Sequence, residues 1–452
     1  IRDCLLSRGL GDVYKRQVIW SNKYDRVKTD IFEVQDEIVT KIINSMHGEI
    51  EINSLKRAHR KPTENMTSYE YTLKGRAFNQ KFEKDANAEA IKMLDAAIEA
   101  DKSNDKFRSE FDRLNNLRNK RNNANRAVQD GRFDDAIQGF GDVLKSVPNS
   151  AESLYGTGKA YEGKKEFLTA VDFYKKSLQV DSGYDKSKKS ISNVAKKLYN
   201  SANQDYKNGN LETALTKYNQ VLIINSRIYQ AHFQIGVLQK KMGNLSMAIE
   251  NYLKALDIKK TYDKGWYSLG LAYKENGDIE NAMNSFKETV RLNNKYYKAH
   301  KSLGDIYIET EDFDMAITSF QKAIDVKSNY SFAHHSLGIA YAKIENYEKS
   351  ANALSKAVEL SPKEFLSWFH LAEAYNKLGD CKAAKEAALE STDLKKNFGG
   401  GWFELGIAEY CSGSGNKNAS VNHFERARND RDWRKMAEYE IDRVRNPEKY
   451  EQ

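Results

Sequence analysis

Histidines and glycines are the residues of this sequence whose spacing comes closest to a reactive site. His334 and His335 are adjacent, so on a helix their rings point to different sides and cannot share a metal ion; we expect structural or surface roles. Gly399–Gly401 precedes a predicted helix whose first N–H groups would suit an anion, but no P-loop lysine follows, which favours a turn. Because no His-Glu-x-x-His or Ser-His-Asp signature is present either, the sequence predicts no catalytic residue, metal site or cofactor.

The cysteines and the hydropathy pattern bear on the compartment. Cys4, Cys381 and Cys411 are odd in number and lack metal-ligand spacing, so we interpret them as free thiols, compatible with a reducing compartment. No apolar run is long enough to span a membrane. We expect a cytoplasmic protein; a periplasmic location is the alternative if an upstream membrane segment is missing.

The stretch 266–286 predicts two helices joined by a tight turn. Four residues at i, i+3, i+4 and i+7 share one face of the first helix: Trp266, Leu269, Gly270 and Tyr273. Gly277 suits the left-handed conformation that ends a helix, and Asp278 suits the cap of the next one. Ala282 and Phe286 mark the apolar face of the second helix. One hairpin cannot bury its apolar side alone, so copies are expected.

Copies recur every 34 residues. The positions equivalent to Gly270 are Ala202, Gly236, Gly304, Gly338, Ala372 and Gly406. Period and pattern resemble the tetratricopeptide repeat family. The resemblance implies an all-α, right-handed superhelical solenoid of about ten helix–turn–helix repeats, with a small N-terminal strand and helix remnant and a C-terminal capping helix. A solenoid of this kind implies a non-catalytic scaffold that binds a protein or peptide.

The resemblance also implies that the first helix of each repeat lines a concave groove. Its fifth position carries a nearly continuous series of aromatic residues, which offer large contact area at low entropic cost: Tyr155, Tyr199, Phe233, Tyr267, Phe369 and Phe403, with Lys301 and His335 between them. We predict peptide contacts at Tyr199, Phe233 and Tyr267. The alternative is that these rings support packing between repeats.

The same groove is rich in lysine over three repeats. Its inward positions carry Lys196, Lys207, Lys240, Lys241, Lys264, Lys274, Lys298 and Lys301, against Glu275 alone. We therefore expect a partner segment rich in Asp and Glu; the alternative is a solvated lysine face. Arginines are scarce there and the groove turns acidic farther on, so no nucleic-acid partner is expected.

One known binding mode of the family is absent. A chaperone-tail clamp would need lysines, asparagines and an arginine at five positions, here occupied by Tyr199, Asn203, Gln234, Lys264 and Ser268. Only Asn203 and Lys264 match, so we do not carry that function over, and Asn203 is kept as a groove residue.

The N-terminal part departs from the repeat pattern. Residues 1–17 begin at Ile1 rather than Met, and we expect them to be extraneous. Trp20-Ser21-x-x-Tyr24-Asp25-Arg26 and the helix that follows, which begins near Asp30 and has Ile31, Val34, Ile38, Ile42 and Met46 on one face, resemble the tail of a bacterial TolB-like domain. The alternative function is therefore the C-terminal sensory half of a nucleotide cyclase or transcriptional regulator, and the alternative structure is a simple capping helix.

The expected organisation follows from these boundaries. We assign residues 18–61 to the TolB-like remnant, 62–104 to a divergent repeat, 105–116 to a linker, 117–434 to nine repeats with an insert near 181–194, and 435–452 to the capping helix and tail. The linker is either a helix or a junction between two joined genes, and the insert lengthens either a helix or a loop. We expect an amphipathic helix over Asp432–Arg445, with Trp433, Met436, Ala437 and Ile441 on the covered side.

Overall fold

The computed structural model describes residues 10–11, 18–20, 71, 74, 92–93, 95–97, 99, 105–411 and 416–450. Strands β1 (Leu10–Gly11) and β2 (Val18–Trp20) pair antiparallel. The strand expected at Val18–Trp20 is therefore present, and β1, from the segment interpreted as extraneous, is its partner. The helix expected around Ile31–Met46 and most of the divergent repeat lie outside the described residues.

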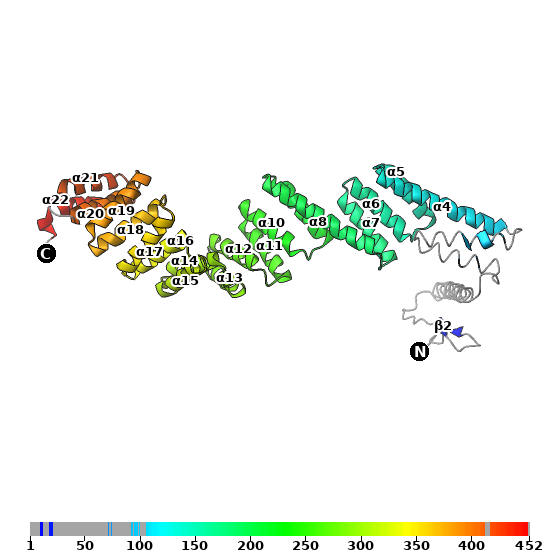
Figure 1. Cartoon of the computed structure of the whole chain (residues 1–452), viewed down its shortest axis with the longest axis horizontal. Helices are drawn as coiled ribbons and strands as arrows, with labels where there is room; N and C mark the ends of the chain where they lie inside the picture. The colour runs from blue at the N-terminus through cyan, green and yellow to red at the C-terminus, as the bar shows by residue number, and fades with distance from the viewer. Residues whose placement is uncertain are drawn as a thin grey trace, which may run out of the picture. The chain divides into compact units, whose positions relative to one another are not determined.

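All other described elements are helices (Figure 1), in two compact units, residues 1–194 and 195–452. Unit 1 contains α4 (Asp105–Gln129), α5 (Phe133–Ser146), α6 (Ala151–Gly163), α7 (Phe167–Val180) and the start of α8 (Asp185–Lys207). Unit 2 contains the rest of α8, then α9 (Leu211–Ile224), α10 (Tyr229–Lys241), α11 (Leu245–Ile258), α12 (Asp263–Glu275), α13 (Ile279–Leu292), α14 (Tyr297–Glu309), α15 (Phe313–Val326), α16 (Ser331–Lys343), α17 (Tyr347–Leu360), α18 (Phe365–Leu378), α19 (Cys381–Leu394), α20 (Gly399–Cys411), α21 (Lys417–Ala427), α22 (Arg434–Arg445) and η3 (Pro447–Lys449). Helices α4 to α21 form nine consecutive hairpins, so the all-α repeat fold is confirmed.

The α12–α13 hairpin shows why the sequence folds this way. Gly277 has φ +82° at the turn, a backbone conformation that favours glycine. Asp278 caps α13, and its side chain accepts from the backbone N–H of Asn281. Ala282 and Phe286 are completely buried. Both the turn and the two apolar faces agree with the prediction.

Glycines at the Gly270 position let the two helices of a hairpin touch. A Cβ atom built on Gly270 would lie 2.7 Å from Phe286, and one on Gly304 would lie 2.4 Å from Phe320. Such distances are too short for a methyl group, so the aromatic ring of the second helix fills the space that the missing side chain leaves.

A ring N–H fixes the loop before each first helix of unit 2, from α10 to α20. At the fourth residue of the helix, either Trp or His donates to the backbone carbonyl six residues earlier. The pairs are His232 with Ser226, Trp266 with Lys260, His300 with Asn294, His334 with Ser328, Trp368 with Pro362, and Trp402 with Lys396, at 2.8–3.0 Å. Because a carbonyl can only accept, each histidine carries its proton on Nε2. His334 thus has the structural role expected.

Every second hairpin also holds a lysine over one ring of an aromatic pair. The Nζ of Lys259 lies 4.7 Å from the centre of the Tyr229 ring, and Tyr229 meets Tyr262 edge to face at 5.1 Å. The same arrangement recurs 68 residues later at Tyr297, Lys327 and Tyr330, and again at Phe365, Lys395 and Phe398. We call each of these a lysine clasp.

Two helices are longer than the repeat requires. Helix α8 has 23 residues against 13 in α10, so the ten extra residues between Gly158 and Ala202 extend a helix rather than a loop. Residues 105–116, expected as a linker, are the first part of the 25-residue helix α4.

The prediction of a turn at Gly399–Gly401 is wrong. These glycines are the buried first turn of α20. A Cβ on Gly399 would lie 2.4 Å from that of Asp430, so the close approach of α20 to its neighbours requires them. Asp430 Oδ2 accepts from the N–H of Gly399 at 2.8 Å, which places the chain's own carboxylate where an external anion would bind.

The cysteine prediction is also wrong for one pair. Cys381 and Cys411 form a disulfide, with Cα atoms 5.6 Å apart. Because disulfides persist in oxidising environments, the pair gives no support to a reducing compartment.

The C-terminal helix presents a slightly different face from the one expected. In α22, Ala437, Glu440, Ile441 and Val444 are buried, whereas Met436 is exposed. Val444, two turns after Ala437, therefore replaces Met436 on the covered side.

Candidate functional site

The first helices of neighbouring hairpins line the inner face of unit 2. Helices α10 and α12 contact each other, as do α14 and α16, α16 and α18, and α18 and α20, whereas no two second helices do so comparably in the described part of unit 2. Elements on the inside of a curved stack approach most closely, so this face corresponds to the predicted groove.

The three aromatic residues predicted to contact a peptide, Tyr199, Phe233 and Tyr267, are half-buried and also take part in packing between helices. Tyr199 lies 5.6 Å from Tyr218 between ring centres. Phe233 contacts Tyr252 of its own hairpin and Tyr262 of the next loop, at 5.6 and 5.1 Å.

Tyr267 repeats this arrangement with Phe286 and Tyr296, at 5.6 and 4.8 Å. Burial raises the pKa of Tyr267. Each of these rings is therefore held rigidly, with only part of its surface open to a partner.

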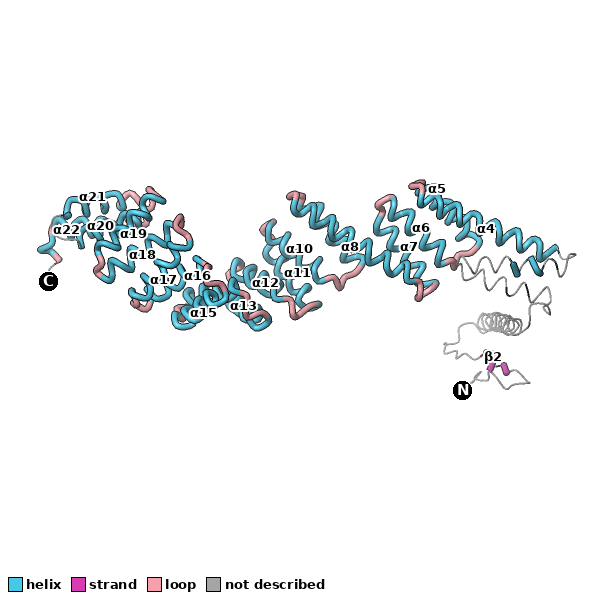
Figure 2. The backbone as a smooth tube through the Cα atoms, in the orientation of Figure 1, coloured by secondary structure: helices cyan, strands magenta, loops and turns pink. Residues whose placement is uncertain are grey.

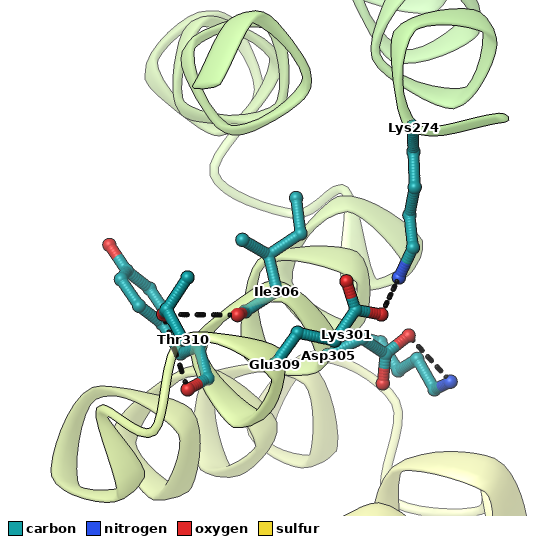
Figure 3. Close-up of polar contacts among 7 residues, drawn as sticks. Lys274, Lys301, Asp305, Ile306, Glu309 and Thr310 are labelled. Atoms are coloured by element: carbon teal, nitrogen blue, oxygen red, sulfur yellow. Dashed lines mark hydrogen bonds and ion pairs between the residues drawn. The ribbon is translucent and has the colours of Figure 1, made fainter. Parts of the chain in front are cut away.

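Three of the predicted groove lysines are neutralised within the chain. Lys240 of α10 pairs with Glu275 of α12 at 2.8 Å, and Lys274 of α12 pairs with Glu309 of α14 at 2.6 Å. Figure 3 shows the second pair, together with Lys301, which meets Asp305 one turn along α14 at 2.8 Å. The first two pairs link successive repeats across the groove face.

The Lys301–Asp305 pair is the most buried of these three ion pairs. Burial raises the pKa of Asp305, although the ammonium group of Lys301 opposes the rise. Desolvation therefore outweighs the ion pair at this carboxyl group.

The remaining predicted groove lysines form no ion pair with a described carboxylate. Lys196, Lys207, Lys264 and Lys298 are exposed, and no ion pair to a described carboxylate involves them. Lys241 lies over the Tyr206 ring, 5.1 Å from its centre. Asn203 accepts a 2.6 Å hydrogen bond from the hydroxyl of Tyr218, so its carbonyl oxygen is used within its own hairpin.

A polar cluster farther along the same face was not anticipated. His335 Nδ1 lies 2.8 Å from Ser367 Oγ, and its ring meets that of His370 at 5.5 Å. Burial lowers the pKa of His335 to about 4, and the neighbouring His370 and Lys301 act in the same direction. The ring is therefore neutral and structural at pH 7. The sequence signal was a pair of histidines 35 residues apart, one more than the repeat.

Glu404 of α20 is the most perturbed carboxyl group of this face. Asn376 Nδ2 donates to its Oε2 at 2.7 Å and to its backbone carbonyl at 3.0 Å. Burial raises the pKa of Glu404 to about 7, against the opposing effect of the Asn376 hydrogen bond.

The described surface also has hollows. One of about 580 Å³ lies beside Trp402, and the Arg426 guanidinium lies 4.4 Å from the centre of the Trp402 ring. Another, of about 230 Å³, lies between α16 and α18 and is lined by Phe332 and Leu366 together with His335 and Ser367. Within the described residues, no three His, Cys, Asp or Glu side chains gather as metal ligands would. No described helix has the length and hydropathy to cross a bilayer.

Comparison with known proteins identifies the repeat. The family described as "TPR repeat" matches residues 240–277 and 304–345, and families described as "Tetratricopeptide repeat" match 121–185, 335–395 and 263–296. No curated protein matches the chain.

Several solved structures are similar. The MamA protein is 23% identical and covers 38% of this chain and 93% of its own, with a TM-score of 0.35. A tetratricopeptide repeat protein from Parabacteroides merdae is 17% identical and covers 56% and 99%, at 0.41. YrrB, described as a TPR protein with an unusual peptide-binding site, is 16% identical and covers 41% and 95%, at 0.37.

Proposed function

We propose that this chain, which contains tetratricopeptide repeats, is a non-catalytic scaffold whose groove between Lys196 and Lys301 binds an acidic protein segment. The observation that carries the proposal is the combination of half-exposed, rigid rings with exposed lysines on one face. Rigid aromatic side chains lose little entropy on binding. Lysines without an internal partner add long-range attraction.

The ion pairs within the groove define which lysines attract the partner. Lys240, Lys274 and Lys301 already face carboxylates, so the attraction rests on Lys196, Lys207, Lys264 and Lys298, with Lys241. The contact area rests on Tyr199, Phe233 and Tyr267. Nearby Asn203 keeps its NH₂ group as a donor toward a carboxylate or a peptide carbonyl.

An array of synthetic peptides with graded Asp and Glu content tests this proposal, followed by titration of the best peptide at two salt concentrations. We expect acidic peptides to bind and the affinity to fall with salt. Phe233→Ala should cost about 1–2 kcal/mol, and the control Tyr439→Ala, at an exposed ring of α22, should cost nothing measurable.

Phe233 also packs against Tyr252 and Tyr262, so a second variant separates contact from stability. Lys196→Glu with Lys207→Glu changes only exposed side chains of α8 and should weaken acidic peptides without changing helicity. Selection of basic peptides, or affinity indifferent to salt and to both variants, would contradict the proposal.

A further inference from the structure

The two edges of unit 2 differ in charge. Each hairpin begins and ends at the same edge, so the loops that join successive hairpins follow one edge of the stack and the turns within hairpins follow the other. Figure 2 draws both in pink. The six loops 224–230, 258–264, 292–298, 326–332, 360–366 and 394–400 hold ten Lys or Arg and two Asp or Glu. The turns within hairpins hold four Lys or Arg and seven Asp or Glu; these turns are 207–211, 241–245, 275–279, 309–313, 343–347 and 377–381. We call the first set of loops the inter-repeat edge.

The charges of the inter-repeat edge are not neutralised by other described residues. None of its ten basic residues forms an ion pair with a described carboxylate. Asp263, one of its two acidic residues, is engaged by the Asn293 side chain and by the backbone N–H of Lys264, both at 2.8 Å. Asp257 and Asp325, in the last turns of α11 and α15, also form no ion pair with these lysines.

The lysine clasps hold part of this charge in place. Lys259 donates to the Tyr229 hydroxyl at 3.1 Å while lying over its ring, and Lys327 lies over Tyr297 in the same way. A cation–π contact orients an ammonium group without cancelling its charge. Lys260 and Lys295 stand exposed in the same loops.

An apolar hollow adjoins this basic strip. The hollow of about 230 Å³ is bordered by Phe332, which is 58% exposed, and Leu366, which is 37% exposed. The Phe332 ring meets Tyr330 at 5.9 Å, and Lys327 lies 5.7 Å from the centre of that tyrosine. Basic strip and hollow are therefore one continuous surface, with Glu364 the only acidic residue lining the hollow.

We propose that the inter-repeat edge is a second docking surface, separate from the groove segment between Lys196 and Lys301, for an acidic protein segment that carries one large apolar side chain. The carboxylates lie along Lys259, Lys260, Lys295 and Lys327, and the apolar side chain enters the hollow at Phe332 and Leu366. Single-stranded nucleic acid fits less well, because the tyrosine rings it would need for stacking are covered by lysines and by one another.

Fluorescence anisotropy with two labelled peptides, eight glutamates followed by phenylalanine and eight followed by glycine, tests the proposal. Lys260→Glu with Lys295→Glu should weaken binding of the first peptide about tenfold at low salt, because two attractive contacts become repulsive. The matched control, Lys322→Glu with Lys382→Glu, makes the same charge change on exposed lysines of α15 and α19 and should have far less effect. Phe332→Ala should abolish the preference for the phenylalanine peptide.

Other occupants are outcomes of the same assay. Equal losses in the edge and control pairs would overturn the proposal, as would tight binding of an oligothymidylate or of phosphatidylserine vesicles with none of the peptide. The Lys196 and Lys207 reversals report on the groove, whereas Phe233, which packs against Tyr262 of the inter-repeat edge, and Lys264 and Lys298 border both surfaces and are left unchanged. If the groove variants lose binding and the edge variants do not, only the groove binds; the reverse result means that only the edge binds. The two proposals can therefore fail independently.

Discussion

At the scale of single residues, close packing of the helices depends on glycines, whose lack of a side chain leaves room for a neighbouring residue. Gly270 leaves the space that Phe286 occupies, and Gly399 leaves the space into which Asp430 fits. Two residue types also make the same hydrogen bond: the ring N–H groups of Trp266 and His300 donate to equivalent backbone carbonyls although the rings differ in shape. Residues that look unrelated in sequence thus perform one structural function.

Glu404 provides a test at this scale. Its pKa of about 7 in the folded chain lies above the ordinary 4.5 because of burial, so the folded state binds this proton more tightly than the unfolded chain. Its stabilising contribution is complete below about pH 4.5 and is lost as the pH rises through 7. We expect Glu404→Gln to be the more stable protein above pH 7, by roughly 3 kcal/mol, with the difference vanishing near pH 4.5.

Denaturant unfolding between pH 4.5 and 8 measures this difference. Glu390→Gln, at an exposed position of α19, is the control and should follow the parent at every pH. The same pH profile for Glu404→Gln and the parent would show that the buried carboxyl group does not carry the proton assigned to it.

At the scale of elements, the last hairpin is joined to the hairpin before it by a disulfide as well as by packing. The disulfide joins the start of α19 to the end of α20. Lys385 of α19 pairs with the buried Glu409 of α20 at 2.7 Å. Helix α22 then covers α21 with Ala437, Ile441 and Val444. The terminal repeat thus gains covalent, ionic and apolar contacts that replace those of a following repeat.

Removal of the disulfide should loosen this end selectively. It closes a loop of 30 residues, for which the chain-entropy estimate is about 3.6 kcal/mol. We expect Cys381→Ser with Cys411→Ser to speed hydrogen exchange in α19 to α22 while α10 to α13 remain unaffected. A reducing agent should reproduce the effect in the parent and do nothing further to the variant. Unchanged exchange in both proteins would mean that the pair does not stabilise this hairpin.

At the scale of the whole molecule, unit 2 combines two periods. The 34-residue repeat sets the hairpins, and the lysine clasps recur every 68 residues. The loops at one edge are basic and the turns at the other are acidic. Because the hairpins contact mainly their neighbours, this arrangement extends along the stack without needing long-range contacts.

Unit 2 should therefore fold without unit 1. A fragment of residues 185–452 keeps α8 whole and retains all internal contacts of its unit, so we expect a helical protein with one cooperative thermal transition. A fragment beginning at Tyr229 removes α8 and α9, uncovers the buried face of α10 that includes Ile235 and Leu238, and should melt at a lower temperature. Equal midpoints for the two fragments, or an unfolded longer fragment, would contradict this view of the stack.

The sequence by itself determined the hairpins, because their signals are local. Gly277 and Asp278 specify a turn, and residues spaced by one helical turn specify a buried face. The exact 34-residue step then required identical units to stack. The aromatic and lysine positions of the groove followed from that register, although their use as a binding site remains a prediction.

Only the tertiary structure decided which of these side chains are engaged. Lys240 and Lys274 looked free because their partners, Glu275 and Glu309, lie 35 residues away in the next repeat. Cys381 and Cys411 are 30 residues apart, and only the antiparallel packing of α19 and α20 brings them together. Gly399–Gly401 looked like a turn because glycine favours turns, whereas close helix packing also requires glycine. Pairing, burial and close approach depend on residues that are neighbours in space but distant in sequence. They therefore cannot be predicted from one repeat at a time.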